Sequence, residues 1–183
     1  MPSLQHEFDW PDRAVIGTLG APGARTFYLQ VRAGTRVASV ALEKQQSALL
    51  AEKIDELLDQ LHAAEGNPFH VPTESAPELL DDEPLEPVEE LFRTGTMALG
   101  WDPATAQIVL EAHRLPEADA EDPAALLDDE PEVADEMLVV RMPVGTARAF
   151  AQRTIGVVDA GRPVCSSCGN PMDPEGHDCP AED

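Results

Sequence analysis

Basic residues are scarce in this 183-residue sequence, which holds 12 lysines and arginines against 35 aspartates and glutamates. The formal net charge is −23 at pH 7. Proteins bind DNA and RNA largely by neutralising phosphates with lysine and arginine, and anionic membrane surfaces attract basic segments in the same way. The composition therefore argues against binding to nucleic acids and to membranes. It favours basic proteins or metal ions as partners.

Long apolar runs are also missing. No stretch approaches the roughly 20 apolar residues that a membrane-spanning helix needs, and residues 1–10 lack the basic start and apolar run of a secretory signal. The sequence therefore predicts a cytoplasmic protein. Aromatic residues make up only 4% of the chain while hydrophobic residues make up 43%. A folded core is expected, and it must be built mainly from valine, leucine, isoleucine and alanine.

The hydrophobic pattern shows two halves with the same order of elements. In the first half, three strand-like segments, the second with clear period-two alternation, precede one segment with helical periodicity. They lie at Arg13–Leu19, Thr26–Arg32, Arg36–Leu42 and Gln45–His62. The second half repeats this order at Leu91–Leu99, Ala106–Ala112, Met137–Arg141 and Pro143–Val158. The sequence thus predicts an α+β domain over residues 1–161. Two β-β-β-α units would form one mainly antiparallel sheet with both helices on one face.

Two acidic inserts interrupt this domain, at residues 63–90 and 114–136. Eight acids and no base occur in residues 74–90, and ten acids and no base occur in residues 117–136. Both inserts contain the hexapeptide Leu-Leu-Asp-Asp-Glu-Pro. Proline-rich segments of one charge repel themselves and rarely order alone. We expect solvated loops, with short docking peptides as the alternative.

Cysteine is absent until residue 165, and all three cysteines then fall within 15 residues. In a reducing compartment such a cluster indicates a metal rather than a disulfide. A Cys-x-x-Cys-Gly hairpin directs two thiolates to one point, and zinc takes four such ligands in a tetrahedron. The sequence predicts one structural Zn²⁺ per chain in a tail over residues 162–183, with four ligands: Cys165, Cys168, His177 and Cys179.

Two alternatives to a structural zinc site are disfavoured. A redox-active Cys-x-x-Cys normally begins a helix, whose dipole lowers the pKa of the thiol, and Gly169 and Pro171 disfavour a helix here. Zinc ribbons often bind nucleic acid, but the tail from Arg162 onward has one base and five acids. Nucleic-acid binding through the tail is therefore disfavoured. Zinc is expected to fold a tail that has no apolar core of its own.

Lysine is the rarest charged residue, with only Lys44 and Lys53. Lys44 follows Glu43 where the third strand passes into the first helix. One interpretation is a local helix cap with a nearby ion pair, which is favoured. The other is an anion pocket that Lys44 and Glu43 share with Arg25 and Arg93. No phosphate-binding glycine loop and no nucleophile motif is present in the sequence, and no catalytic residue is identified.

Several segments resemble a known family: Arg25-Thr-Phe-Tyr-Leu-Gln30, Leu42-Glu-Lys-Gln-Gln46, Gly95-Thr-Met-Ala-Leu-Gly-Trp-Asp102 and Cys165-x-x-Cys168-Gly-x-Pro-Met-Asp-Pro-Glu-Gly-His177-x-Cys179. Together they are similar to an uncharacterised bacterial, actinobacterial-type family, domain of unknown function 3090, with a zinc-ribbon-like tail. The resemblance carries over the four tail ligands and no catalytic residue. Members of this kind are encoded beside a histidine-phosphatase-like protein and a protein resembling phosphatidylinositol kinases. This implies a shared pathway involving phosphoryl transfer.

These observations predict a non-catalytic binding or adaptor protein with a structural zinc site. Its partner is expected to be a protein, either a basic one or one of the phosphatase- or kinase-like neighbours. The alternative is an enzyme or nucleotide-binding protein that uses Lys44, Glu43 and the two arginines. Convergence of these side chains in a concave site would favour the alternative. Their spread over a surface, paired with carboxylates, would favour the adaptor.

Overall fold

The computed structural model describes residues 4–20, 24–115, 136–159, 165, 167–169 and 180, together with Cys179. Seven strands, two α-helices and one 3₁₀ turn occur in these residues: β1 (Leu4–Asp9), β2 (Arg13–Leu19), β3 (Thr26–Ala33), β4 (Arg36–Leu42), α1 (Lys44–Ala63), η1 (Pro77–Leu79), β5 (Glu90–Asp102), β6 (Gln107–Arg114), β7 (Glu136–Pro143) and α2 (Val144–Asp159). All eight predicted strands and helices are present, with ends within a few residues. Strand β1 is an additional element that the hydrophobic pattern did not indicate.

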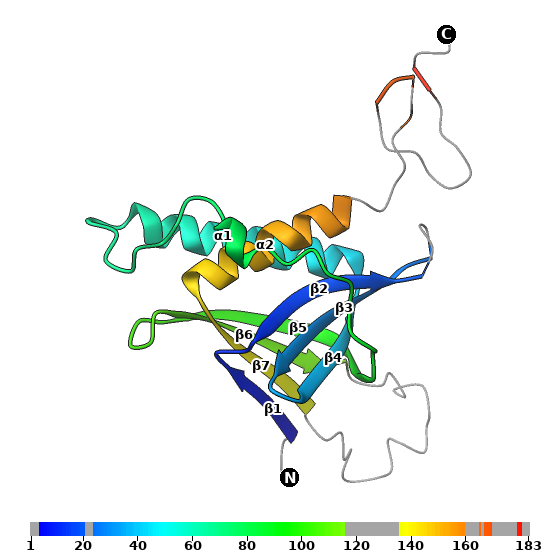
Figure 1. Cartoon of the computed structure of the whole chain (residues 1–183), viewed down its shortest axis with the longest axis horizontal. Helices are drawn as coiled ribbons and strands as arrows, with labels where there is room; N and C mark the ends of the chain where they lie inside the picture. Colours follow the sequence, from blue (N-terminus) through cyan, green and yellow to red (C-terminus); the bar gives the residue numbers. More distant parts are fainter. Residues whose placement is uncertain are drawn as a thin grey trace, which may run out of the picture.

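The strands form one sheet in the order β1-β7-β6-β5-β4-β3-β2. Strands β2, β3 and β4 are antiparallel to one another, and so are β5, β6 and β7. The two groups meet through the parallel pair β4–β5, and β1 adds to β7 as a second parallel pair. Figure 1 shows both helices on the same side of this sheet. The predicted α+β class, with a mainly antiparallel sheet and two β-β-β-α units, is confirmed.

The sheet must curve because its two edge strands are consecutive in the sequence. Only residues 10–12 separate β1 from β2, and such a link spans at most about 14 Å. Opposite edges of a flat sheet of seven strands would lie about 29 Å apart. The link is anchored to the neighbouring strands: the Asp12 amide donates to the Arg32 carbonyl at 2.8 Å, and the Gly34 amide donates to Asp12 Oδ2 at 2.6 Å. Figure 1 shows the resulting bend of the sheet.

One hydrophobic core lies between the helices and the sheet. Helix α1 contributes Leu50, Ile54 and Leu58, and α2 contributes Phe150, all at most 4% exposed. This core is mainly aliphatic, as the composition predicts. No helix of the described residues is long and apolar enough to span a membrane.

Arg148 of α2 links the two helices through a mostly buried guanidinium group. Its side chain is 7% exposed, and its Nη atoms contact Asp55 at 2.9 Å and Asp59 at 3.0 Å on α1. The Nε atom donates to the Pro72 carbonyl at 3.1 Å. The guanidinium group therefore finds partners for three of its nitrogens, which offsets the desolvation of a buried charge.

Residues 77–86 of the first acidic insert, which we call the strap, run from α2 past β2 to the outer face of the sheet. Gln30 projects from β3 on the face opposite the core and is 1% exposed. Its side-chain amide exchanges two hydrogen bonds with the backbone of Glu86, at 2.8 and 3.0 Å. Leu85 lies so close to Gly17 of β2 that a Cβ atom there would be 2.6 Å from Leu85 Cγ. The strap is therefore a loop held against the sheet by these contacts, although six of its ten residues are exposed. Most of the second insert, residues 116–135, lies outside the described residues.

Candidate metal centre and cavity

Three cysteine sulfurs converge near the end of the chain. The Sγ atoms of Cys165, Cys168 and Cys179 all lie within 4.8 Å of one another, and those of Cys165 and Cys179 are 3.8 Å apart. Two thiolates on one tetrahedral zinc ion, each about 2.3 Å from the metal, would be about 3.8 Å apart. The Gly169 amide donates to the Cys165 carbonyl at 2.9 Å, and Gly169 has a φ of +76°. Glycine adopts this left-handed conformation without strain, which explains its place in the hairpin.

The electrostatics of the hairpin favour the metal-binding form of the thiol. The backbone amide of Cys168, followed by that of Ser167, donates to the Cys165 sulfur and lowers the pKa of Cys165 to about 7. Cys165 is 8% exposed. The thiolate is the form of cysteine that binds metals, so these amides prepare Cys165 for that role. Three close cysteines of this kind can hold a metal ion.

The fourth predicted ligand, His177, lies outside the described residues. The structure therefore brings together three of the four predicted ligands, all of them cysteines. Three sulfurs leave one position of a tetrahedral zinc ion for another donor.

The predicted anion-pocket residues have different partners. Glu43 forms an ion pair with Arg93, in which both side chains are more than half exposed. Arg25 has other contacts: its Nη2 atom donates to the Val157 carbonyl at 3.4 Å, and its guanidinium group is 5.3 Å from the centre of the Phe27 ring. Lys44 is half-buried and has no ion-pair partner among the described residues. This arrangement favours the local-cap interpretation of the segment.

The hydrogen bonds of the Gln46 side chain give the Glu-Lys-Gln-Gln motif a structural role. Its Oε1 atom accepts a hydrogen bond from the Glu43 amide at 2.7 Å, as in a capping box. Its Nε2 atom donates to the carbonyl oxygens of Gly95 at 2.8 Å and Thr94 at 3.2 Å. Two of the segments that carried the family resemblance therefore meet here, where Gln46 ties the start of α1 to an irregular part of β5.

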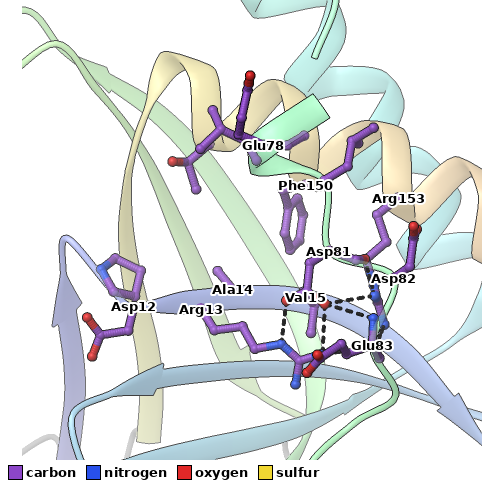
Figure 2. A pocket seen from close by; sticks show the side chains of 15 residues that line it. Asp12, Arg13, Ala14, Val15, Glu78, Asp81, Asp82, Glu83, Phe150 and Arg153 are labelled. Carbon is purple, nitrogen blue, oxygen red and sulfur yellow. Dashed lines mark hydrogen bonds and ion pairs between the residues drawn. The ribbon is translucent and has the colours of Figure 1, made fainter. Parts of the chain in front are cut away.

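A cavity of about 380 Å³ lies between the start of β2, the strap and α2. Figure 2 shows the Phe150 ring near its centre, with Glu78 above, Asp12 to one side and Asp82 to the other. The cavity is lined by 15 residues: Pro11, Asp12, Arg13, Ala14, Val15, Glu78, Leu79, Leu80, Asp81, Asp82, Glu83, Thr146, Ala149, Phe150 and Arg153. None of Arg25, Glu43, Lys44 and Arg93 is among them.

Two arginines hold the strap in place along one side of this cavity. Arg13 of β2 contacts both carboxylate oxygens of Asp81, at 2.6 and 3.1 Å, and donates to the carbonyls of Glu83 and Pro84. Arg153 of α2 donates to the carbonyls of Asp81 and Glu83. The Arg13 and Arg153 side chains are only 8% and 12% exposed. The hydrogen bond from Arg13 is the main reason that the pKa of Asp81 lies below its usual value.

The sequence contained one signal for this cavity, the repeated hexapeptide. Its first copy, residues 79–84, provides Leu79, Leu80, Asp81, Asp82 and Glu83 to the lining. The two arginines gave no comparable signal, because Arg13 and Asp81 are 68 positions apart in the sequence. Their pairing depends on the curvature that brings β2 beside α2.

The fold and the cysteine cluster define an α+β protein with a mainly antiparallel seven-stranded sheet and a potential metal-binding site near its C-terminus. The chain belongs to the family described as protein of unknown function (DUF3090), which matches residues 6–179. The resemblance seen in the sequence is thereby confirmed, and the matched region includes Cys165, Cys168 and Cys179. No curated protein and no solved structure matches the chain.

Proposed function

We propose that this chain is a non-catalytic binding or adaptor protein of the cytoplasm, with a C-terminal tail folded by one structural zinc ion. The ligands would be Cys165, Cys168, Cys179 and His177. The observation that carries the proposal is the convergence of three sulfurs within 4.8 Å. Zinc is the metal most typical of a site with three cysteines and one histidine, and four protein ligands leave no open position for catalysis.

Histidine is the natural fourth donor for this site. His177 is two residues before Cys179, so a short turn can deliver both side chains to one ion. Small segments without a core often fold only when a metal binds, because the binding free energy becomes folding free energy. This explains why the cysteines of the chain are confined to its last 19 residues.

The adaptor role is supported by the charge of the chain and by the placement of its few cations. With a net charge of −23, the protein attracts basic partners and approaches them rapidly. The cavity is lined by none of Arg25, Glu43, Lys44 and Arg93, and Arg93 is paired with Glu43. We propose a protein partner that is basic or belongs to the phosphatase- and kinase-like neighbours that the family resemblance implies.

Elemental analysis of the purified full-length protein tests the metal assignment. We expect one zinc ion per chain, and loss of that zinc in Cys165→Ser or Cys168→Ser. Ser167→Ala is the matched control, since it lies in the same hairpin without being a predicted ligand, and it should retain the metal. Wild-type protein without stoichiometric metal would refute the proposal.

Cobalt substitution tests the identity of the fourth ligand. Tetrahedral Co²⁺ bound by thiolates absorbs strongly in the visible range, and its spectrum changes with the number of sulfur ligands. We expect His177→Ala to weaken Co²⁺ binding and His177→Cys to restore it with a spectrum of four sulfurs. Unchanged Co²⁺ affinity and an unchanged spectrum in His177→Ala would show that His177 is not a ligand.

A further inference from the structure

We propose that the cavity between β2, the strap and α2 is the docking site for a basic side chain, lysine or arginine, presented by a partner protein on an apolar stretch. This inference rests on the proposed binding function, whose partner surface it identifies. It does not depend on zinc, because none of the described residues of the cysteine tail is among those that line the cavity.

The charge of the lining indicates a cationic ligand. Five carboxylates line the cavity, from Asp12, Glu78, Asp81, Asp82 and Glu83, against the two guanidinium groups of the arginines. Both arginines are already engaged by Asp81 and by strap carbonyls. An incoming anion would therefore meet an excess of negative charge, whereas an ammonium or guanidinium group would be attracted.

Two of the carboxylates are positioned to take up such a cation. Glu78 and Asp82 are exposed and form no ion pair within the described part of the chain. Figure 2 shows them on different sides of the Phe150 ring. A hydrogen bond between a carboxylate and a cationic side chain is stronger than one between neutral groups, so the rim offers a favourable place for a charged head.

The interior of the cavity suits the stem of a basic side chain. Ala14, Ala149 and Phe150 line it, and because each is largely buried they give it a small apolar floor. Lysine and arginine bury their methylene stems on apolar surfaces while the charged end stays at a polar rim. The volume of about 380 Å³ lies near the lower end for ligand pockets, which fits a side chain and its neighbours rather than a large cofactor.

Exposed apolar side chains next to the cavity extend the surface for a partner protein. Leu79 lines the cavity and is 46% exposed, and Trp10, which precedes the lining residue Pro11, is 57% exposed. Tryptophan is among the residues that contribute most to protein–protein binding. The combination of exposed apolar contacts with an acidic rim fits a basic, partly apolar segment of a protein better than a free polyamine.

Isothermal titration calorimetry with a synthetic peptide tests this site. The probe is an acetylated and amidated decapeptide that alternates arginine and leucine, titrated into the full-length, zinc-loaded protein at moderate salt. Its control replaces each arginine with citrulline, which keeps the stem and shape but removes the charge. We expect the arginine peptide to bind and the citrulline peptide to bind at least about tenfold more weakly.

Paired variants separate the cavity from general electrostatic attraction. Glu78→Gln with Asp82→Asn removes two rim charges and leaves the contacts of Asp81 intact, whereas Glu52→Gln with Glu65→Gln removes two charges from α1 and the residues after it. Both change the net charge by the same amount. We expect about a tenfold loss of peptide affinity in the first pair and less than about a twofold loss in the second.

Three outcomes would overturn the proposal: no measurable binding of the arginine peptide, equal losses in the two variant pairs, or equal binding of the citrulline peptide. Thermal melts of both variant pairs check that the fold is retained. Titration of Cys165→Ser distinguishes this inference from the metal assignment. Unchanged peptide binding there supports a docking site that is independent of the tail, whereas loss of binding would overturn that independence.

Discussion

The strap and the cysteine tail are both too poor in apolar residues to form a core, yet they are held by different means. The strap is fixed by the body of the protein: two arginines pair with its carboxylate and carbonyls, and Gln30 bonds to its backbone. In the tail, the sulfur atoms of the three cysteines lie within 4.8 Å of one another, close enough to share a metal ion. The comparison shows that the strap finds its partners on the folded body, whereas the cysteines of the tail lie close to each other.

The largest effect is expected from removal of the metal. Treatment with a strong chelator should make the tail readily cleaved by protease, because structural zinc sites contribute about 10–16 kcal/mol to the folding of small segments. The body should keep its cooperative melt, with a midpoint shift below about 2 °C. Limited proteolysis with mass spectrometry and scanning calorimetry measure the two effects. A large fall in the melting temperature of the body would show that the tail is part of its cooperative unit.

The next largest effect is expected from Asp81→Ala. This change leaves two mostly buried guanidinium groups without their carboxylate, and breaking a buried pair from one side costs about 3–5 kcal/mol. Because both arginines keep their hydrogen bonds to the strap carbonyls, we expect the loss of unfolding free energy to be near the lower end of that range. Urea unfolding measures it, and Glu89→Ala, an exposed site just after the strap, should change stability by less than about 0.5 kcal/mol. Equal losses at both positions would contradict the role given to Asp81.

Gly17→Ala is expected to have a smaller effect on the same contact surface. The added Cβ would lie 2.6 Å from Leu85 Cγ, so the strap must shift, at a cost of about 1–3 kcal/mol. Combining it with Leu85→Ala should cost less than the sum of the single changes, since the clash disappears. Gly100→Ala is the control, because a Cβ there meets nothing within 4 Å. Strict additivity of the two changes would show that Leu85 does not pack on Gly17 in solution.

The smallest effect is expected from acidification. Because Arg13 holds the pKa of Asp81 below its usual value, the Arg13–Asp81 pair stabilises the fold. This stabilisation is complete at pH values above the unfolded-state pKa of aspartate, about 3.9. It is lost as the pH falls toward the lower folded-state pKa. Wild-type protein should therefore lose stability below about pH 4 more steeply than Asp81→Asn. Urea midpoints between pH 3 and 6 measure the difference, and parallel pH profiles would contradict it.

Most of the fold could be predicted from the sequence because its strands and helices are strongly periodic. Strands such as β3 alternate apolar and polar residues, and α1 repeats its leucines at helical spacing. Strand β1 gave no such signal: of its six residues only Phe8 is buried. It is a strand because the edge of β7 offers it partners, and that depends on contacts distant in the sequence.

Of the two candidate sites, one could be predicted from the sequence and the other could not. The three cysteines could be predicted as a group because they are close in the sequence, and cysteines at such a spacing have few roles other than metal binding. The cavity could not, because its walls come from β2, the strap and α2, and its key contact joins Arg13 to Asp81. The acidic composition of the strap suggested a solvated loop, since composition says nothing about the two arginines that would meet it.

The order of strands and helices and the grouping of the three cysteines were determined by the sequence itself, since both depend on residues that are near neighbours along the chain. The tertiary structure alone decided the curvature of the sheet, the binding of the strap and the existence of the cavity. The physical reason is that a three-residue link joins the two edges of the sheet. That closure brings β2 beside α2, so that two separate arginines can hold one carboxylate between them.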